Sequence, residues 1–273
     1  MASFKTLKQH GLRYAVGSAL RKAGDDLEYS AGRRSHDPVP FKEYQITVDD
    51  VSMVLDFGNI PITKPIWQRI EGMREPETTV IIRSLLREGD KVLELGSAFG
   101  YFTMLMSASV GDTGSVLSIE GLPEYFAILS RNIARNNAEN VELMNAFIGS
   151  KADYVFFEPE ATSPYSGIND YKSGKASTDD GNKISVKCIN LQQMLQDKRY
   201  HPTHIFMDIE GFEVEALEQL SNAYLREHNP VIIFEHHEKF YDTAKGLNYI
   251  KSLLGACGYT TRTIYDNVIA FKS

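Results

Sequence analysis

The sequence contains few cysteines and no excess of basic residues. Only two of its 273 residues are cysteines, Cys188 and Cys257, and both lie in apolar surroundings without metal-ligand spacing. They indicate reduced core thiols and argue against a disulfide scaffold. Lys and Arg total 29 against 36 Asp and Glu, a net charge of -7. A protein that binds nucleic acid mainly through positive charge is therefore not expected.

Long hydrophobic segments are also missing. No run approaches the roughly 20 apolar residues that cross a bilayer, and the N-terminus lacks the apolar core of a signal peptide. We therefore expect a cytoplasmic protein without a membrane span. Residues 5–22 carry five Lys or Arg residues, no acid and an apolar face. This stretch can form a helix that contacts a membrane surface, serves as a transit peptide or, as we favour, packs on its own domain or on a second subunit of a homodimer.

The stretch Val92–Phe102 predicts a strand, a glycine-rich turn and a helix. Its β-forming residues end at Leu95, glycines follow at Gly96 and Gly100, and apolar residues resume at helical spacing from Tyr101. Glycine at these places lets the backbone turn sharply and lets a ligand or the helix approach closely. Free N–H groups at the start of the helix then point toward the ligand.

An acidic residue, Glu120, follows the next predicted strand, Ser115–Ile119. An acid at the end of the second strand of a βαβ unit commonly holds a ribose, because one carboxylate accepts hydrogen bonds from two neighbouring hydroxyls. Together with Glu94 in the first motif, it favours a nucleoside site over an ordinary turn. The spacing Glu-x-Gly-x-x-x-Gly differs from the Gly-x-Gly-x-x-Gly of nicotinamide dehydrogenases.

The remaining pattern predicts an α/β fold. Strands and helices alternate after residue 90, which is typical of a parallel sheet whose strand ends gather at one edge. Strands are expected at Val141–Phe147, His204–Met207 and Val231–Phe234, and the last two, Tyr259–Ile264 and Val268–Phe271, form an antiparallel hairpin. This layout resembles a Rossmann-like class I methyltransferase: seven strands, mostly parallel, with helices on both faces.

Two parts of the chain lie outside this alternating pattern. Residues 1–60 are expected to form an extension, with a basic helix and a hairpin built from Glu43–Val48 and Ser52–Phe57. Residues 61–273 form the main domain. Within it, residues 159–182 predict a long loop, where Tyr165 and Tyr171 would suit stacking against a ring-shaped acceptor.

Four motifs resemble those of the FkbM family of S-adenosylmethionine-dependent methyltransferases. The resemblance covers roughly residues 75–272, and its most specific element is the Asp-x-Glu-Gly-x-Glu run at 208–213 after a hydrophobic strand. It implies O-methylation of a hydroxyl on a sugar, a glycan or a secondary-metabolite scaffold. The four motifs are Glu75–Glu77, Glu94–Thr103, Cys188–Leu195 and Met207–Glu213.

The chain departs from the family pattern at three places. Glu94 stands where the family commonly has Asp, and Ser97-Ala98 stand where it has Ala-Asn. Phe206 occupies the place of a Lys, so we expect its side chain to face the core and the substrate site to lack a cation. The resemblance implies that Glu94, Gly96 and Gly100 line the methionine side of the cofactor. The full set of predicted cofactor-binding residues is Glu94, Gly96, Ser97, Gly100, Tyr101, Phe102, Glu120, Gly121 and Asp208.

Two mechanisms fit the polar residues at the predicted strand ends. Methyl transfer by in-line displacement requires an aligned acceptor and removal of its hydroxyl proton. In the first mechanism, His236 or His237 is the general base, and Asp208 or Glu210 orients it or the acceptor. In the second, Asp208, Glu235 and His236 bind Mg²⁺ or a similar ion, which lowers the pKa of the hydroxyl. The sequence favours the base mechanism.

Two other classes of function compete with the methyltransferase. A nicotinamide oxidoreductase shares the sheet and the acid after the second strand, but the glycine spacing and the antiparallel last pair argue against it. A non-catalytic methyltransferase-like scaffold would bind no cofactor. The joint presence of Glu94, Gly96, Gly100, Glu120 and Asp208 argues against such a degenerate site.

Overall fold

The computed structural model describes residues 43–58, 68–150, 153–157, 183–241 and 245–272. The predictions for residues 5–22 and for the loop at 159–182, with Tyr165 and Tyr171, lie outside these ranges. Within them, no helix is both long and apolar enough to cross a bilayer. The cytoplasmic location and the homodimer stay predictions.

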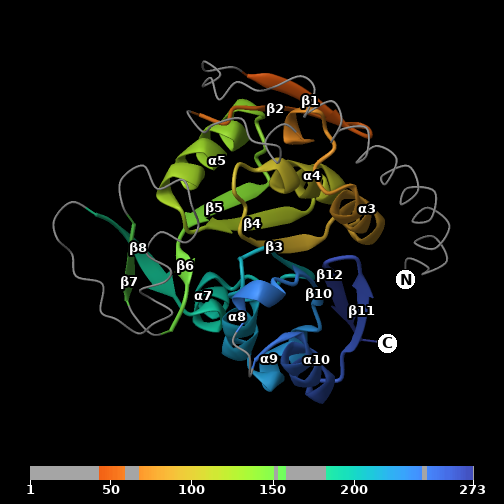
Figure 1. Ribbon diagram of the computed structural model, residues 1–273. Helices are drawn as coiled ribbons and strands as arrows, with labels where there is room; N and C mark the ends of the chain where they lie inside the picture. The colour runs from red at the N-terminus through yellow and green to blue at the C-terminus, as the bar shows by residue number, and fades with distance from the viewer. Residues whose placement is uncertain (1–42, 59–67, 151–152, 158–182, 242–244, 273) are drawn as a thin grey trace.

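Seven strands form the central sheet, in the order β11-β12-β10-β9-β3-β4-β5 (Figure 1). The neighbours β5, β4, β3, β9 and β10 run parallel, whereas β12 is antiparallel to both β10 and β11. The predicted fold class, with its antiparallel last hairpin, is confirmed. The bounds are β3 Lys91–Leu95, β4 Ser115–Glu120, β5 Val141–Asn145, β9 His204–Met207, β10 Val231–Glu235, β11 Thr260–Ile264 and β12 Asn267–Phe271.

Helices cover both faces of this sheet, as expected. Successive side chains of a strand point to opposite faces, so Val92 packs in one core and Leu93 in the other. The first core contains α3, α4 and α5, and the second contains α7 to α10 (Figure 1). The bounds are α3 Pro76–Leu85, α4 Tyr101–Val110, α5 Pro123–Arg135, α7 Leu191–Lys198, α8 Glu213–Gln219, α9 Asn222–His228 and α10 Leu247–Ala256.

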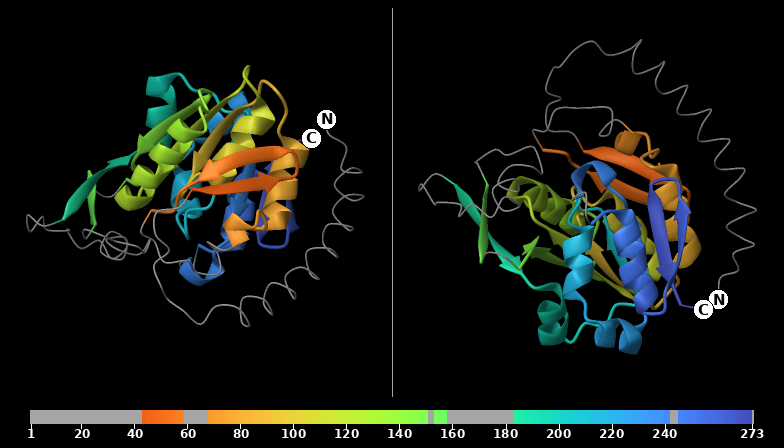
Figure 2. Two further views of the ribbon diagram at one scale, coloured as in Figure 1. Left: turned by 90° about the horizontal axis from the view of Figure 1, so that it is seen from above. Right: turned by 60° about the horizontal axis from the view of Figure 1, so that its bottom comes forward.

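The predicted N-terminal hairpin is present as β1 (Tyr44–Val48) and β2 (Val51–Leu55), an antiparallel pair. Its buried side chains, among them Met53, join the first core. The hairpin lies beside α4 and α5 (Figures 1 and 2). Asn132 of α5 fixes its end, because it accepts a hydrogen bond from the Asp56 N–H at 2.8 Å. A domain boundary at residue 60 stays a prediction, although the hairpin shares the core of the main domain.

One predicted strand is wrong in its extent. The stretch Val141–Phe147 breaks at Ala146, so that β5 stays in the main sheet and β6 (Phe147–Ile148) pairs with β8 (Ile184–Ile189) instead. The Ala146 N–H bonds the Glu120 carbonyl at 3.3 Å, which is where the chain leaves the main sheet. Together with β7 (Tyr154–Phe157), these strands form a small second sheet that projects from the first (Figures 1 and 2).

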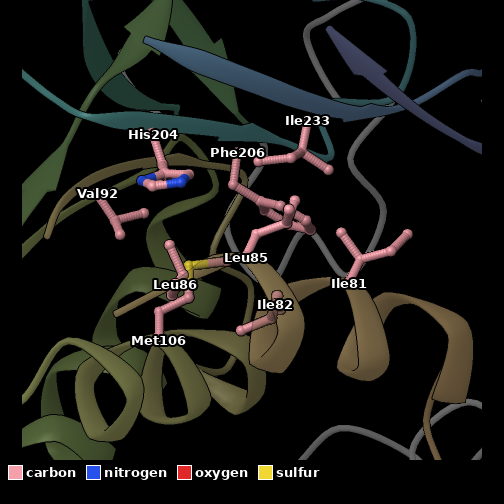
Figure 3. A pocket seen from close by; sticks show the side chains of 9 residues that line it. All are labelled: Ile81, Ile82, Leu85, Leu86, Val92, Met106, His204, Phe206 and Ile233. Carbon is pink, nitrogen blue, oxygen red and sulfur yellow. The ribbon is translucent and has the colours of Figure 1, made fainter. Parts of the chain in front are cut away.

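Phe206 faces the core, as the sequence predicted. It is 3% exposed, and its ring centroid lies 6.1 Å from that of Phe102. Figure 3 shows the side chain in a small apolar cavity between the sheet and helices α3 and α4, together with Ile81 and Met106. The place that the family commonly gives to Lys is therefore part of the apolar interior in this chain.

Candidate active site at the carboxyl edge of the sheet

The glycine-rich turn connects β3 to α4 and brings two strand ends together. Gly96 has a φ of 87°, and its N–H donates to the Ile119 carbonyl at 2.9 Å. The Asp208 N–H donates to the Leu95 carbonyl, also at 2.9 Å. A Cβ on Gly96 would lie 1.9 Å from the Asp208 carbonyl oxygen, so only glycine permits this approach. Gly100, with a φ of 90°, caps the start of α4.

Glu120 lies at the end of β4, directly beside this turn. Its two carboxylate oxygens accept hydrogen bonds from the N–H groups of Ala98, at 2.8 Å, and Leu122, at 2.7 Å. The residue is 8% exposed, and burial raises its pKa while these backbone hydrogen bonds lower it. The carboxylate is thus held rigidly where the sequence places the ribose site, and Gly121 follows it.

Glu94 lies behind the turn and is covered by α4. Its Oε2 atom accepts hydrogen bonds from the hydroxyls of Thr103, at 2.6 Å, and Ser118. Burial raises the pKa of Glu94 to about 7, against the effect of these hydrogen bonds. At 1% exposed, the residue can hold the turn and the start of α4 but has almost no surface for a ligand. Ser97, Tyr101 and Phe102 are also buried.

The raised pKa of Glu94 makes stability depend on pH. Folding favours the protonated form of Glu94. The resulting stabilisation of the folded state is complete below the ordinary pKa of 4.5 and is lost as the pH rises through about 7. Raising the pH from 5 to 8 should cost the wild type roughly 2 to 3 kcal/mol through this one group. In Glu94→Gln, which keeps an oxygen for Thr103 and Ser118, that loss should vanish. Urea unfolding at pH 5 and pH 8 measures this loss. An equal pH dependence of the unfolding free energy in the wild type and in Glu94→Gln would refute the role of Glu94.

A second group of polar side chains gathers around His237, after the ends of β9 and β10. The Nε2 atom of His237 lies 3.4 Å from Asp208 Oδ1, 3.6 Å from Glu210 Oε2 and 4.0 Å from Glu235 Oε1. On the other side of the ring, Nδ1 lies 3.0 Å from Glu213 Oε1. One imidazole therefore stands between four carboxyl groups, and three of the four residues were predicted as site residues.

The electrostatics of this group follow from the crowding of acids. Burial raises the pKa of Asp208 well above its usual range, and the charge of Glu235 raises it further. Burial, and next the charge of Glu75, raise the pKa of Glu235 to about 7. Burial lowers the pKa of His237, but the hydrogen bond to Glu213 and the surrounding carboxylates outweigh it and raise the pKa to about 9. A cation is strongly favoured at this place.

The histidine that lies with Asp208 and Glu235 is His237, whereas the metal set predicted from the sequence contained His236. Ligand atoms of Asp208, Glu235 and His237 all lie within 4.8 Å of one another, which suits a metal ion. His236 is not in that group, and its backbone N–H donates to the Asp266 carbonyl at 2.8 Å. Alternate residues of a strand face the same side, so Glu235 and His237 share a side at the end of β10, and His236 between them does not join the group.

Two residues near the site were not predicted from the sequence. Glu213 was noted only as part of the family motif, yet its buried carboxylate touches His237. Arg69 carried no signal at all, since it precedes α3 and belongs to no motif. Its guanidinium carbon lies 5.6 Å from the centroid of the Phe99 ring in the glycine-rich turn, and burial lowers its pKa to about 10. It therefore remains a cation at neutral pH.

The strand order, the glycine-rich turn after the central strand and the acid after its neighbour define a class I methyltransferase fold. Residues 94–261 match the model of the methyltransferase FkbM domain. The chain belongs to this family, as the motifs predicted.

Individual relatives share only part of this chain. The protein-L-isoaspartate O-methyltransferase of Methanothrix thermoacetophila is 42% identical over 59 residues, which is 22% of this chain and 28% of that protein. Among solved structures, the O-methyltransferase of Bacillus cereus in complex with SAH is 17% identical, with a TM-score of 0.48 over 73% of this chain and 82% of that one. The methyltransferase FkbM of Methylobacillus flagellatus KT is 17% identical, with a TM-score of 0.45 over 76% and 54%.

Proposed function

We propose that this chain is an S-adenosylmethionine-dependent O-methyltransferase that acts on a hydroxyl of a sugar, a glycan or a secondary-metabolite scaffold. The observation that carries the proposal is a juxtaposition at one edge of the sheet. The glycine-rich turn and Glu120 lie there beside the acids around His237. Asp208 connects the two groups, because its backbone carbonyl lies next to Gly96 and its side chain lies next to His237. Family membership supports this cofactor over a nicotinamide and argues against a scaffold without ligand.

The residues at the turn fit the proposed cofactor. When bound, S-adenosylmethionine supplies a methyl group activated on a sulfonium sulfur. Glu120 would accept hydrogen bonds from the two ribose hydroxyls, since each carboxylate oxygen has a lone pair beyond its backbone bond. The backbone of Gly96 and the end of β9 at Asp208 would border the methionine half. Arg69 offers a half-buried positive charge for the carboxylate of that half.

The donor set around His237 fits a hard divalent cation. Asp208, Glu235 and His237 would be its ligands, because their two carboxylates and one imidazole have ligand atoms within 4.8 Å of one another. When bound, the cation supplies Lewis acidity toward the acceptor hydroxyl. Glu210, whose side chain is 38% exposed, would receive the hydroxyl proton.

This geometry favours the metal mechanism over the base mechanism that the sequence favoured. A His237 pKa of about 9 leaves the imidazole protonated at neutral pH in the absence of a metal, which makes it a poor base there. Its Nε2 atom also faces the carboxylates of Asp208 and Glu235, which would be co-ligands of a bound cation. The base mechanism remains the alternative and would give activity that rises toward pH 9.

Removing divalent metal tests the metal mechanism. Dialysis against EDTA should lower methyl transfer from labelled S-adenosylmethionine to a responsive hydroxyl acceptor by about 100-fold, which corresponds to about 2.7 kcal/mol of lost transition-state stabilisation. Adding Mg²⁺ or Mn²⁺ should restore it. Full activity in EDTA, with a rise toward pH 9, would instead establish His237 as the base.

A further inference from the structure

The carboxylate of Glu213 is the most deeply buried acid next to the proposed reaction centre. Glu213 is the first residue of α8 and is 0% exposed. Its Oε1 atom accepts hydrogen bonds from the N–H groups of Ile209 and Gly211, both at 3.3 Å, and lies 3.0 Å from His237 Nδ1. Burying a carboxylate costs several kcal/mol unless hydrogen bonds or charges compensate it. The contact with an imidazole provides both.

The same carboxylate connects the two segments that carry the proposed ion ligands. Its backbone contacts hold the turn after β9, where Glu210 has a φ of 52° and Gly211 a φ of 96°. That turn carries Asp208. The contact with His237 holds the segment after β10. Because the ring atom facing Glu213 is Nδ1, the opposite atom, Nε2, faces Asp208 and Glu235.

We propose that Glu213 is the positioning residue of this site: it binds the Nδ1–H of His237 and thereby directs Nε2 toward Asp208, Glu235 and a bound divalent cation. Histidines that bind metals generally donate their second ring N–H to a carboxylate or carbonyl, which fixes the tautomer and makes the ligand more basic. The ion ligation is taken from the proposed function, whereas the orientation of His237 follows from the contacts alone. At 0% exposed, Glu213 has no surface to offer a cofactor or an acceptor and would act only through His237.

Glu213→Gln tests this role, because glutamine keeps an oxygen for the Ile209 and Gly211 N–H groups but loses the charge that faces His237. Calorimetric titration with Mn²⁺ should show an affinity about 10- to 100-fold weaker than that of the wild type. Affinity for S-adenosylhomocysteine should change less than about twofold, because glutamine keeps the oxygen that accepts from the Ile209 and Gly211 N–H groups and so preserves the turn after β9. Glu215→Gln is the matched control, because Glu215 lies on the same helix and bonds Ser150 instead.

A second measurement keeps this test independent of metal binding. Without metal, NMR titration of the His237 imidazole should show a pKa lower by about one unit or more in Glu213→Gln, because the negative charge beside Nδ1 is gone. If the titration of His237 is the same in both proteins, Glu213 does not act on this ring and the proposal fails. If the pKa falls but the wild type binds no Mn²⁺, the orientation of His237 stands and the metal part of the proposed function fails. Equal Mn²⁺ affinity in wild type and Glu213→Gln would also overturn the proposal.

Discussion

Replacing Gly96 with alanine is expected to abolish cofactor binding and to destabilise the fold by about 4 kcal/mol or more, the range of a severe local clash. The added Cβ would lie 1.9 Å from the Asp208 carbonyl oxygen, which is backbone and cannot turn away as a side chain can. The φ of 87° is also unfavourable for any residue with a Cβ. Thermal unfolding should show a midpoint lower by about 10 °C, and calorimetry should show affinity for S-adenosylhomocysteine reduced at least about 100-fold.

Gly258→Ala separates the two causes. Gly258 has a φ of 86°, nearly that of Gly96, but an added Cβ would meet no atom within 4 Å. It should therefore cost only the backbone penalty of about 1 to 2 kcal/mol and leave cofactor affinity unchanged. Comparable losses of stability and of S-adenosylhomocysteine affinity in both variants would mean that the site does not depend on the contact between the turn and the end of β9.

Removing the imidazole of His237 is expected to lower kcat at least about 100-fold, the size of effect seen when a directly acting group is lost. The variant His237→Ala deletes the group that stands between Asp208, Glu210 and Glu235. Affinity for S-adenosylhomocysteine should stay within a few fold, because the turn and Glu120 remain. Turnover measured at saturating cofactor, together with calorimetry of the same protein, separates the two effects.

His236→Ala is the matched control for that variant. The two histidines are neighbours in the chain, but the ligand atoms near Asp208 and Glu235 come from His237, and His236 bonds Asp266 through its backbone. Activity of His236→Ala should remain within about threefold of the wild type. A large loss in His236→Ala with little loss in His237→Ala would restore the metal set predicted from the sequence.

Most of the fold could be predicted from the sequence because local patterns determine it. The alternation of strands and helices after residue 90 gives a parallel sheet, and the turn signal at Asp266-Asn267 gives the antiparallel last pair. Apart from Asn145, no turn residue marks the break at Ala146: Leu143 and Met144 precede it and Phe147 and Ile148 follow it, which is the pattern of one continuous strand. The break depends on a distant partner, since Phe147 pairs with Cys188 across more than forty residues.

The candidate site was predictable to the level of strand ends, but not to the level of side-chain direction. The placement of Glu120 and Asp208 follows from the rule that ligands bind at the carboxyl ends of parallel strands. Which of two adjacent histidines faces inward depends on the backbone after β10, and no residue pattern reports it. Glu94 shows the same limit: its strand position was right, but its carboxylate points under α4 to Thr103.

The first measurement is calorimetric titration of the folded wild-type chain with S-adenosylhomocysteine, with NAD as the competing ligand. A nucleoside site at the glycine-rich turn predicts micromolar affinity for S-adenosylhomocysteine, at least about tenfold weaker binding in Glu120→Ala, where the ribose hydrogen bonds are lost, and no binding of NAD. Absence of S-adenosylhomocysteine binding to well-folded wild type, or unchanged affinity in Glu120→Ala, would contradict the placement of the cofactor at this edge of the sheet.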